Sequence, residues 1–256
     1  NFTISHNTIT SSNGGTIAGS LRGIFMHNGT ASTGTVVNNI NNNSISLKSA
    51  FATGAIQGIS IETPTVNATT TLNINNNDFN NFGHTVAASG AINGIINVAP
   101  ALVLSISNNT FTNLTVNTSG AFTFLSSSIT LPVGGSQTVS GNSIVTAFSK
   151  TGDGGAVTLF TTTSNSPTGT TSTSSNNNFS NITVVGATII AGWINRDGAS
   201  ATSGPLKTVT NNTFNNWTAG TGSITALTVN ASAANSATSG NTITNMNGTA
   251  AITGIA

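Results

Sequence analysis

The stretch Leu104-Ser-Ile-Ser-Asn-Asn-Thr-Phe-Thr-Asn-Leu114 decides the fold of this chain. Leu104 and Ile106 alternate with serines, which is the period of a strand that is buried on one side. The pair Asn108-Asn109 interrupts this alternation, and Phe111 restarts it. Because asparagine tolerates the left-handed region of backbone space and bonds to its own backbone, we predict a tight bend at Asn109. The stretch therefore predicts a strand, a bend and a second strand.

The same pattern, apolar-x-x-Asn-x-(Ile/Phe), occurs eight times in the 256 residues. Its asparagines are spaced by 36, 34, 32, 33, 35, 35 and 29 residues. A period in this range is typical of one supersecondary unit that is copied and stacked as a solenoid. The Ile or Phe two positions later predicts a column of inward side chains. We call the repeated residues the anchor asparagines, and they are Asn7, Asn43, Asn77, Asn109, Asn142, Asn177, Asn212 and Asn241.

Two further segments complete each repeat. Gly54-Ala-Ile-Gln-Gly-Ile-Ser-Ile61 represents a second strand, in which the spacing of three between Ile56 and Ile59 predicts a bulge or bend at the glycine between them. Whether both isoleucines face inward stays open from the sequence. The third segment is variable and holds all five prolines, so we predict turns there. Its most polar tract, Thr161 to Ser175, is predicted to be a surface excursion.

The predicted fold class is all-β. No stretch combines the helical period with helix caps, and the many Thr, Val, Ile, Gly and Asn residues disfavour helix. We predict a parallel β-helix, a solenoid of about eight coils of ~33 residues with three strands per coil. Residues 1–256 are predicted to be one β-helix segment that continues past both ends in a longer chain. No run of about 18 apolar residues occurs, so no membrane span is predicted in this segment.

At this point a family resemblance becomes specific. The stretch Ile106-Ser-Asn-Asn-Thr-Phe-Thr-Asn-Leu114, followed by Gly120-Ala-Phe122, resembles the right-handed parallel β-helix repeat of the pectin-lyase-like superfamily. The resemblance covers all eight coils and implies a right-handed β-helix. It does not imply one activity, because that superfamily includes polysaccharide lyases, glycosidases, phage tailspikes and non-catalytic surface proteins.

Composition excludes several classes of function. Five basic and four acidic residues give a net charge of +1, and the scattered lysines and arginines do not form the cluster that nucleic acid requires. Cysteine is absent, which excludes disulfides and cysteine metal sites. The apolar residues are periodic, so the chain is predicted to be ordered in spite of its polar composition.

The acidic residues do not predict a catalytic site. A glycosidase needs two carboxylates roughly 5–10 Å apart, and a calcium-dependent lyase needs several oxygen ligands. Glu62, Asp78, Asp153 and Asp197 fall in four different coils. We therefore predict no enzymatic activity and no catalytic, metal or cofactor site.

The remaining polar groups have structural interpretations. His27 is predicted to stack on Glu62 one coil away, either as a minimal His–Glu site or, more simply, as a surface ion pair of little energetic value. The other two histidines, His6 and His84, lie at different offsets in the repeat. Arg196 and Asp197 are predicted to be a solvated pair of neighbours, and Gly152-Asp-Gly-Gly155 a turn. The anchor asparagines are predicted to bond from coil to coil as an asparagine ladder.

These observations favour a non-enzymatic shaft or spacer of a large extracellular bacterial surface protein, adhesin or filamentous appendage. The expected partners are neighbouring segments of the same chain or identical chains in an assembly, with surface glycans as a further candidate. The alternative is a carbohydrate-binding or carbohydrate-processing β-helix, which exposed aromatic residues along one face would favour. A third interpretation, an ice-binding solenoid, needs outward threonines in register, and runs such as Thr69-Thr-Thr71 do not recur in register.

Overall fold

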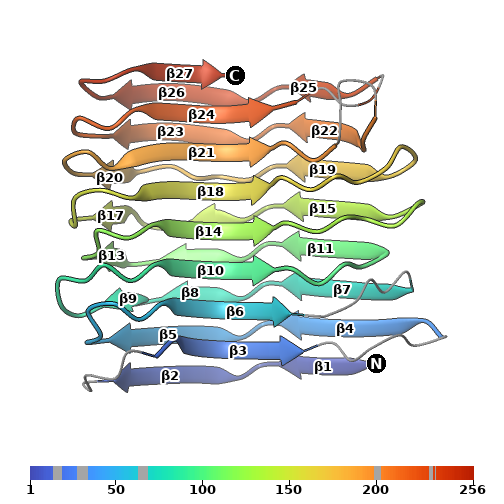
Figure 1. Cartoon of the computed structure of the whole chain (residues 1–256), viewed down its shortest axis with the longest axis horizontal. Helices are drawn as coiled ribbons and strands as arrows, with labels where there is room; N and C mark the ends of the chain where they lie inside the picture. The colour runs from blue at the N-terminus through green and yellow to red at the C-terminus, as the bar shows by residue number, and fades with distance from the viewer. Residues whose placement is uncertain (14–18, 28–33, 63–68, 199–202, 231–232, 234) are drawn as a thin grey trace.

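The computed structural model describes residues 1–13, 19–27, 34–62, 69–198, 203–230, 233 and 235–256. In these ranges the chain forms 27 strands and no helix. The strands lie in successive coils that are stacked from β1 at the N-terminus to β27 at the C-terminus (Figure 1), and the strand pairs between coils in the described ranges are all parallel. The prediction of an all-β parallel solenoid is therefore confirmed. Within the described ranges no helix is long and apolar enough to cross a membrane.

One side of the coil is an eight-stranded parallel sheet, which we call sheet 1, with one strand from each repeat. Ile40, Ile74, Ile106 and Val139 are stacked in register along it and are fully buried. The residues that alternate with them point outward. The strands of sheet 1 are β1 (Phe2–Ser5), β4 (Val36–Asn41), β7 (Thr70–Asn75), β11 (Val103–Ser107), β15 (Ser136–Ser140), β19 (Thr171–Ser175), β22 (Leu206–Thr210) and β25 (Ala237–Ser239).

A second side, sheet 2, also has eight parallel strands. Ile56 and Ile59 are both fully buried, which answers the question that the sequence left open. The strands of sheet 2 are β3 (Leu21–His27), β6 (Ile56–Glu62), β10 (Ile92–Asn97), β14 (Phe122–Ser127), β18 (Ala156–Thr162), β21 (Ile189–Asn195), β24 (Ile224–Val229) and β27 (Ile252–Ile255).

The glycine between the two isoleucines has a packing role. A Cβ atom on Gly58 would lie 2.4 Å from Cε1 of Phe79 and 2.7 Å from the carbonyl oxygen of Gly94. Only a residue without a side chain therefore lets the strand approach the aromatic column. Neighbouring strands keep the same register on both sides of this glycine, so each strand bends in the same way. A register shift between strands occurs at β18 and β21, where Gly192 has a φ of 64°.

The third side of the coil consists of shorter strands in two sheets, of six and five strands. Bridges from Asn178 to Ser143 and to Thr213 connect the two groups. The first group is β2 (Thr8–Asn13), β5 (Ser44–Ser49), β8 (Asp78–Asn80), β9 (Gly83–His84), β12 (Thr110–Thr112) and β16 (Ser143–Ile144). The second group is β13 (Leu114–Val116), β17 (Phe148–Lys150), β20 (Ile182–Val184), β23 (Thr213–Thr218) and β26 (Thr242–Asn247).

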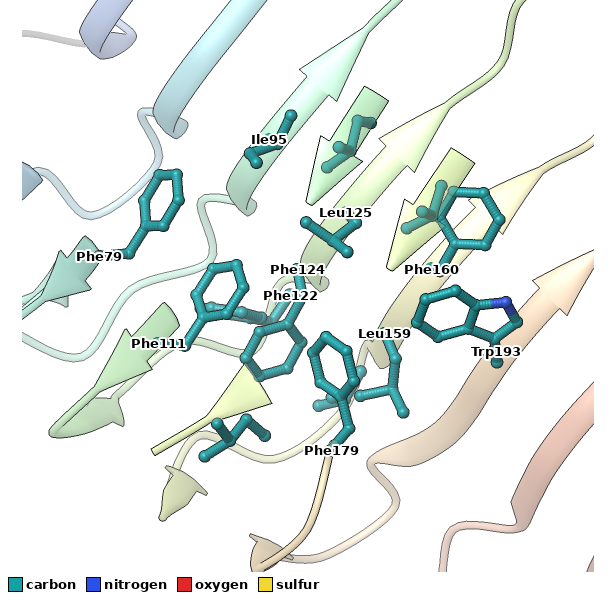
Figure 2. Packing of buried hydrophobic residues seen from close by; sticks show 14 of the residues in the cluster. Phe79, Ile95, Phe111, Phe122, Phe124, Leu125, Leu159, Phe160, Phe179 and Trp193 are labelled. Carbon is teal, nitrogen blue, oxygen red and sulfur yellow. The ribbon is translucent and has the colours of Figure 1, made fainter. Parts of the chain in front are cut away.

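The core is a set of columns that run along the axis. Phe111 stacks on Phe79 with ring centroids 4.9 Å apart, and the edge of its ring meets Phe124 at the same distance. Figure 2 shows these rings with Phe179 and Trp193, packed between strands of successive coils. Phe111 and Phe214 are fully buried, as the repeat predicted. The four prolines in the described ranges lie outside strands, whereas the fifth, Pro64, lies outside the described residues.

The predicted position of the bend was wrong by one residue. The left-handed residue is Asn108, with a φ of 56°, and not Asn109. The same holds in every coil, because the residue immediately before each anchor has a positive φ. These residues are His6, Asn42, Asn76, Asn108, Gly141, Asn176, Asn211 and Gly240. Two adjacent residues therefore have separate roles: the first forms the bend, and the second is the anchor.

The prediction of a surface excursion from Thr161 to Ser175 holds only for its middle, residues 163–170, which lie outside strands. The last five residues of the tract form β19, which pairs along its full length with β15 and β22. Ser172 and Ser174 point inward and are fully buried. Pairing with the two neighbouring strands holds this segment in the sheet, although its side chains carry no apolar alternation.

Candidate functional site

The anchor asparagines form one continuous ladder through the molecule. The Nδ2 of each anchor donates to the Oδ1 of the next anchor, over distances of 2.8 to 3.0 Å. The backbone N–H of each anchor donates to the same Oδ1. Seven such links join Asn7 to Asn241, so the predicted asparagine ladder is confirmed.

A second bond ties each rung to sheet 1. The Nδ2 of Asn109 also donates to the carbonyl oxygen of Ile74 at 2.8 Å, and Asn142 binds Ile106 in the same way at 2.9 Å. From Asn43 to Asn212 the anchors are at most 1% exposed. A buried amide that satisfies both its donors and its acceptor holds its position strongly. The ladder therefore fixes each coil against the next.

The four carboxylates do not come together. Asp78 accepts hydrogen bonds from the hydroxyls of Thr110 and Thr112 and from the amide of Asn80. The Oδ1 of Asp153 accepts the N–H of Ala187 at 2.5 Å. Each of these groups holds a neighbouring coil or turn, and neither faces a second carboxylate in these contacts.

The contacts of the other two carboxylates, Glu62 and Asp197, differ from those predicted. His27 and Glu62 are register partners as predicted, but the ion pair of Glu62 is with Arg22, at 3.3 Å. Asp197 is not solvated, because it is only 1% exposed and accepts the N–H of Ser166 at 2.8 Å, whereas Arg196 is exposed. No group of three or more His, Asp or Glu side chains in the described ranges could hold a metal ion.

His84 is a buried group that the sequence did not predict. It lies in β9 and is 4% exposed, and neither ring nitrogen has hydrogen-bonding geometry to a partner among the described residues. Burial lowers the pKa of its imidazole, and the nearby carbonyls of Gly90 and Phe51 partly oppose this shift. The ring is therefore held neutral inside the corner of the coil.

Two lysines are buried, and sequence reasoning missed both. The Nζ of Lys150 donates to the carbonyls of Gly152 and Gly154, at 2.6 and 2.5 Å, so the glycine-rich turn folds around an ammonium group. Burial lowers the pKa of Lys150, and the charge of Asp153 opposes this. The predicted turn at residues 152–155 is thus a lysine-binding loop.

The second buried lysine is Lys207 in β22. Its Nζ donates to the backbone carbonyl of Asn230 at 2.8 Å and to the Oδ1 of the same residue. Burial lowers the pKa of Lys207 to about 8, and the Asp197 carboxylate partly opposes this shift. Both lysines serve as internal cross-links between segments. Their neighbours in the chain are mostly Ser and Thr, so the sequence pattern did not indicate that the lysines are buried.

The outer surface of sheet 1 carries hydroxyl groups in register. Thr138, Thr173 and Thr208 are Cα partners on three consecutive strands. A parallel row two residues further along consists of Ser140, Ser175 and Thr210. Single outward threonines therefore recur in register on these three strands, although threonine runs such as Thr69-Thr-Thr71 were not expected to recur.

Exposed aromatic residues do not form a row. Among the described Phe and Trp side chains, Phe2 and Phe25 are the exposed ones, at 52% and 46%. They lie on different sheets, and the Arg22 guanidinium covers the ring of Phe25 at 4.5 Å from its centroid. The described surface thus lacks the stacked rings on which sugars dock.

The two outermost coils have unpaired strand edges. Strands β1 and β3 pair on one side only, as do β25 and β27. Apolar side chains are exposed there, including Phe2 in the first coil and Ile252 and Ile255 in the last. Unpaired backbone next to exposed apolar residues is the arrangement that pairs with a further strand.

No family model, curated protein or solved structure matches this chain. The resemblance to the pectin-lyase-like superfamily accordingly stays a prediction, whereas the parallel β-helix itself is given by the strand pairing.

Proposed function

We propose that this β-helix is a non-enzymatic shaft or spacer of an extracellular bacterial surface protein or filament. The observation that carries this proposal is the asparagine ladder, which links all eight repeats through side-chain bonds that are buried from Asn43 to Asn212. Each coil also pairs with its neighbours along two long sheets. In a solenoid, stability sums over neighbouring coils, so such a ladder resists bending and separation at every level.

The polar chemistry of the chain supports the same proposal. The contacts of Glu62, Asp78, Asp153 and Asp197 are with neighbouring segments of the protein itself. A general acid or base needs a carboxylate that faces the substrate. We therefore expect no turnover of polyuronides or neutral glycans. Turnover that is lost on substituting any one of these four residues would refute this expectation.

The partner in this proposal is a further β-helical coil, from a neighbouring segment of the same chain or from an identical chain. Edge strands β1 and β27 offer unpaired backbone and exposed apolar residues for such pairing. The test is sedimentation and electron microscopy of this segment at increasing concentration. We expect end-to-end rods.

A charge at the edge makes this test specific. Ile255→Lys places a charge on the outermost strand, so it should shorten or abolish the rods. Val133→Lys is the matched control, because Val133 is 75% exposed on the side of the coil, away from the edge strands. Association that persists in Ile255→Lys, or that is lost equally in Val133→Lys, would contradict stacking through the coil ends.

A second candidate function is binding to ice through the outer face of sheet 1. The observation that favours it is the double row of hydroxyls on β15, β19 and β22, whose outward side chains carry no charge and whose strands lie about 4.8 Å apart. The test compares ice-crystal growth in the presence of the protein and of Thr173→Leu. Thr158→Leu, on the outer face of sheet 2, is the control. Crystal growth that is unaffected by the unaltered protein would exclude this candidate.

A further inference from the structure

A row of polar side chains runs through the interior where sheet 1 and sheet 2 approach each other. On sheet 2 it contains the last residue of four consecutive strands, and on sheet 1 the second residue of three. All are at most 2% exposed. We call this row the polar seam, and it consists of Asn97, Ser127, Thr162 and Asn195 from sheet 2 and Gln137, Ser172 and Lys207 from sheet 1.

The polar seam is enclosed by apolar residues along the axis. The register partner of Asn97 in the preceding coil is Ile61, and that of Gln137 is Leu104. The partner of Asn195 in the following coil is Val229. Three ends of the polar seam are thus bordered by apolar residues.

Hydrogen bonds across the polar seam satisfy only some of its polar atoms. The Ser127 hydroxyl donates to the Oε1 of Gln137 at 2.8 Å, and the Nδ2 of Asn195 donates to the Ser172 hydroxyl at 3.1 Å. Four buried atoms have no hydrogen-bond partner among the described residues. They are Asn97 Nδ2, Gln137 Nε2, Thr162 Oγ1 and Asn195 Oδ1.

The contrast with the anchor ladder explains why these atoms lack partners. Strands in neighbouring coils lie about 4.8 Å apart, so side chains in register bond directly only where both turn toward each other, as the hydroxyls of Ser107 and Ser140 do at 3.1 Å. Identical asparagines span this gap because each amide has a donor at one end and an acceptor at the other. The polar seam mixes Asn, Ser, Thr and Gln, so neighbouring groups do not reach each other. One water molecule between two such groups fits that spacing, since it both donates and accepts.

We propose that the polar seam binds a file of ordered water molecules that bridge Asn97, Gln137, Thr162 and Asn195 from coil to coil. Buried water typically satisfies polar groups that have no protein partner and needs two to four polar contacts. Two donors, one acceptor and one hydroxyl provide these contacts here. The file ends at Lys207, whose ammonium has two acceptors on Asn230 and a third proton to donate.

Ser174 provides a matched contrast within the same strand as Ser172. Its hydroxyl is also buried without a partner, but its register neighbours are Val139 and Val209. An apolar column offers no second polar contact to a water molecule. The hydroxyl of Ser174 is therefore expected to be dry, whereas that of Thr162 is hydrated.

The direct test is a crystal structure of the unaltered protein at a resolution that shows ordered water, together with water-oxygen magnetic relaxation dispersion, which counts long-lived internal water. We expect density bonded to the four partnerless atoms. An empty seam in the crystal, with no long-lived water in solution, would overturn the proposal.

If the proposal holds, two substitutions change the melting temperature in opposite directions. Thr162→Val keeps the shape of the side chain but removes a water contact, so it should lower the melting temperature and the number of long-lived waters. Ser174→Val removes a dry hydroxyl, so it should raise the melting temperature and leave the water count unchanged. If Thr162→Val instead stabilises the protein as Ser174→Val does, the seam is dry and the proposal is wrong. Thr162→Ser, which keeps the hydroxyl, should retain the water if the valine variant does not fold.

Discussion

The anchor ladder makes a prediction that separates two adjacent asparagines. Asn109 is buried and bonded on both sides, whereas Asn108 is exposed and provides the left-handed bend. We predict that Asn109→Leu destabilises its coil much more than Asn108→Leu does. The two variants carry the same chemical change one residue apart, so each is the control of the other.

The magnitude follows from the bonds of each side chain. Asn109 donates to Asn142 and to the carbonyl of Ile74, and it accepts two hydrogen bonds from Asn77. Four bonds at a net value of about 1 kcal/mol each give a loss of roughly 4 kcal/mol. The Asn108 side chain makes no hydrogen bond to another described residue, so Asn108→Leu loses none, and placing leucine in the left-handed region costs about 1–2 kcal/mol.

Native-state hydrogen exchange is the suitable assay because stability in a solenoid is local. The reporter is the amide of Asn77, which donates to the Oδ1 of Asn109. A loss of roughly 4 kcal/mol raises its exchange rate about a thousand-fold, whereas Asn108→Leu should raise it about ten-fold. Equal changes in the two variants would refute the assignment of separate roles to the bend and the anchor.

Three further predictions concern the core. Phe111→Ala should cost about 3–5 kcal/mol, because it empties the stack between Phe79 and Phe124, and chemical denaturation should show this loss. Stability should rise from about pH 8 to 10.5, because the pKa of Lys207 is about 8 in the folded chain and has its ordinary value of 10.5 in the unfolded chain, which therefore binds more protons in that window. Lys207→Gln should flatten this slope, and an unchanged slope would contradict the prediction. The amides of β19 should exchange faster than those of β15 and β22, because its inward residues are Ser172 and Ser174; equal protection would show that strand pairing alone sets local stability.

The architecture could be predicted from the sequence because one short pattern repeats at a nearly constant spacing. The bend was misplaced because the clearest copy has asparagine at both positions 108 and 109. A signal was present elsewhere, since Gly141 and Gly240 precede their anchors, and glycine is the residue that adopts positive φ most readily. The anchor is always asparagine because its side chain forms the ladder. The residue before it varies because it has to supply only the left-handed backbone conformation.

The interior polar groups could not be predicted from alternation of apolar and polar residues. β19 has no apolar side chain, and its place in sheet 1 is set by β15 and β22. The sequence indicated only that the lysines are scattered, and burial of a charge is costly, yet Lys150 and Lys207 are buried with carbonyl partners. Such positions depend on contacts between coils about 33 residues apart in the chain.

The most direct test of the shaft proposal is mechanical. The chain would be held at its two ends and extended in a single-molecule force experiment. We predict a series of discrete unfolding steps, each releasing roughly 110 Å of chain, which is the extended length of one coil at about 3.4 Å per residue. Smooth extension at low force, without steps of that size, would show that the coils do not resist load and would contradict the proposal.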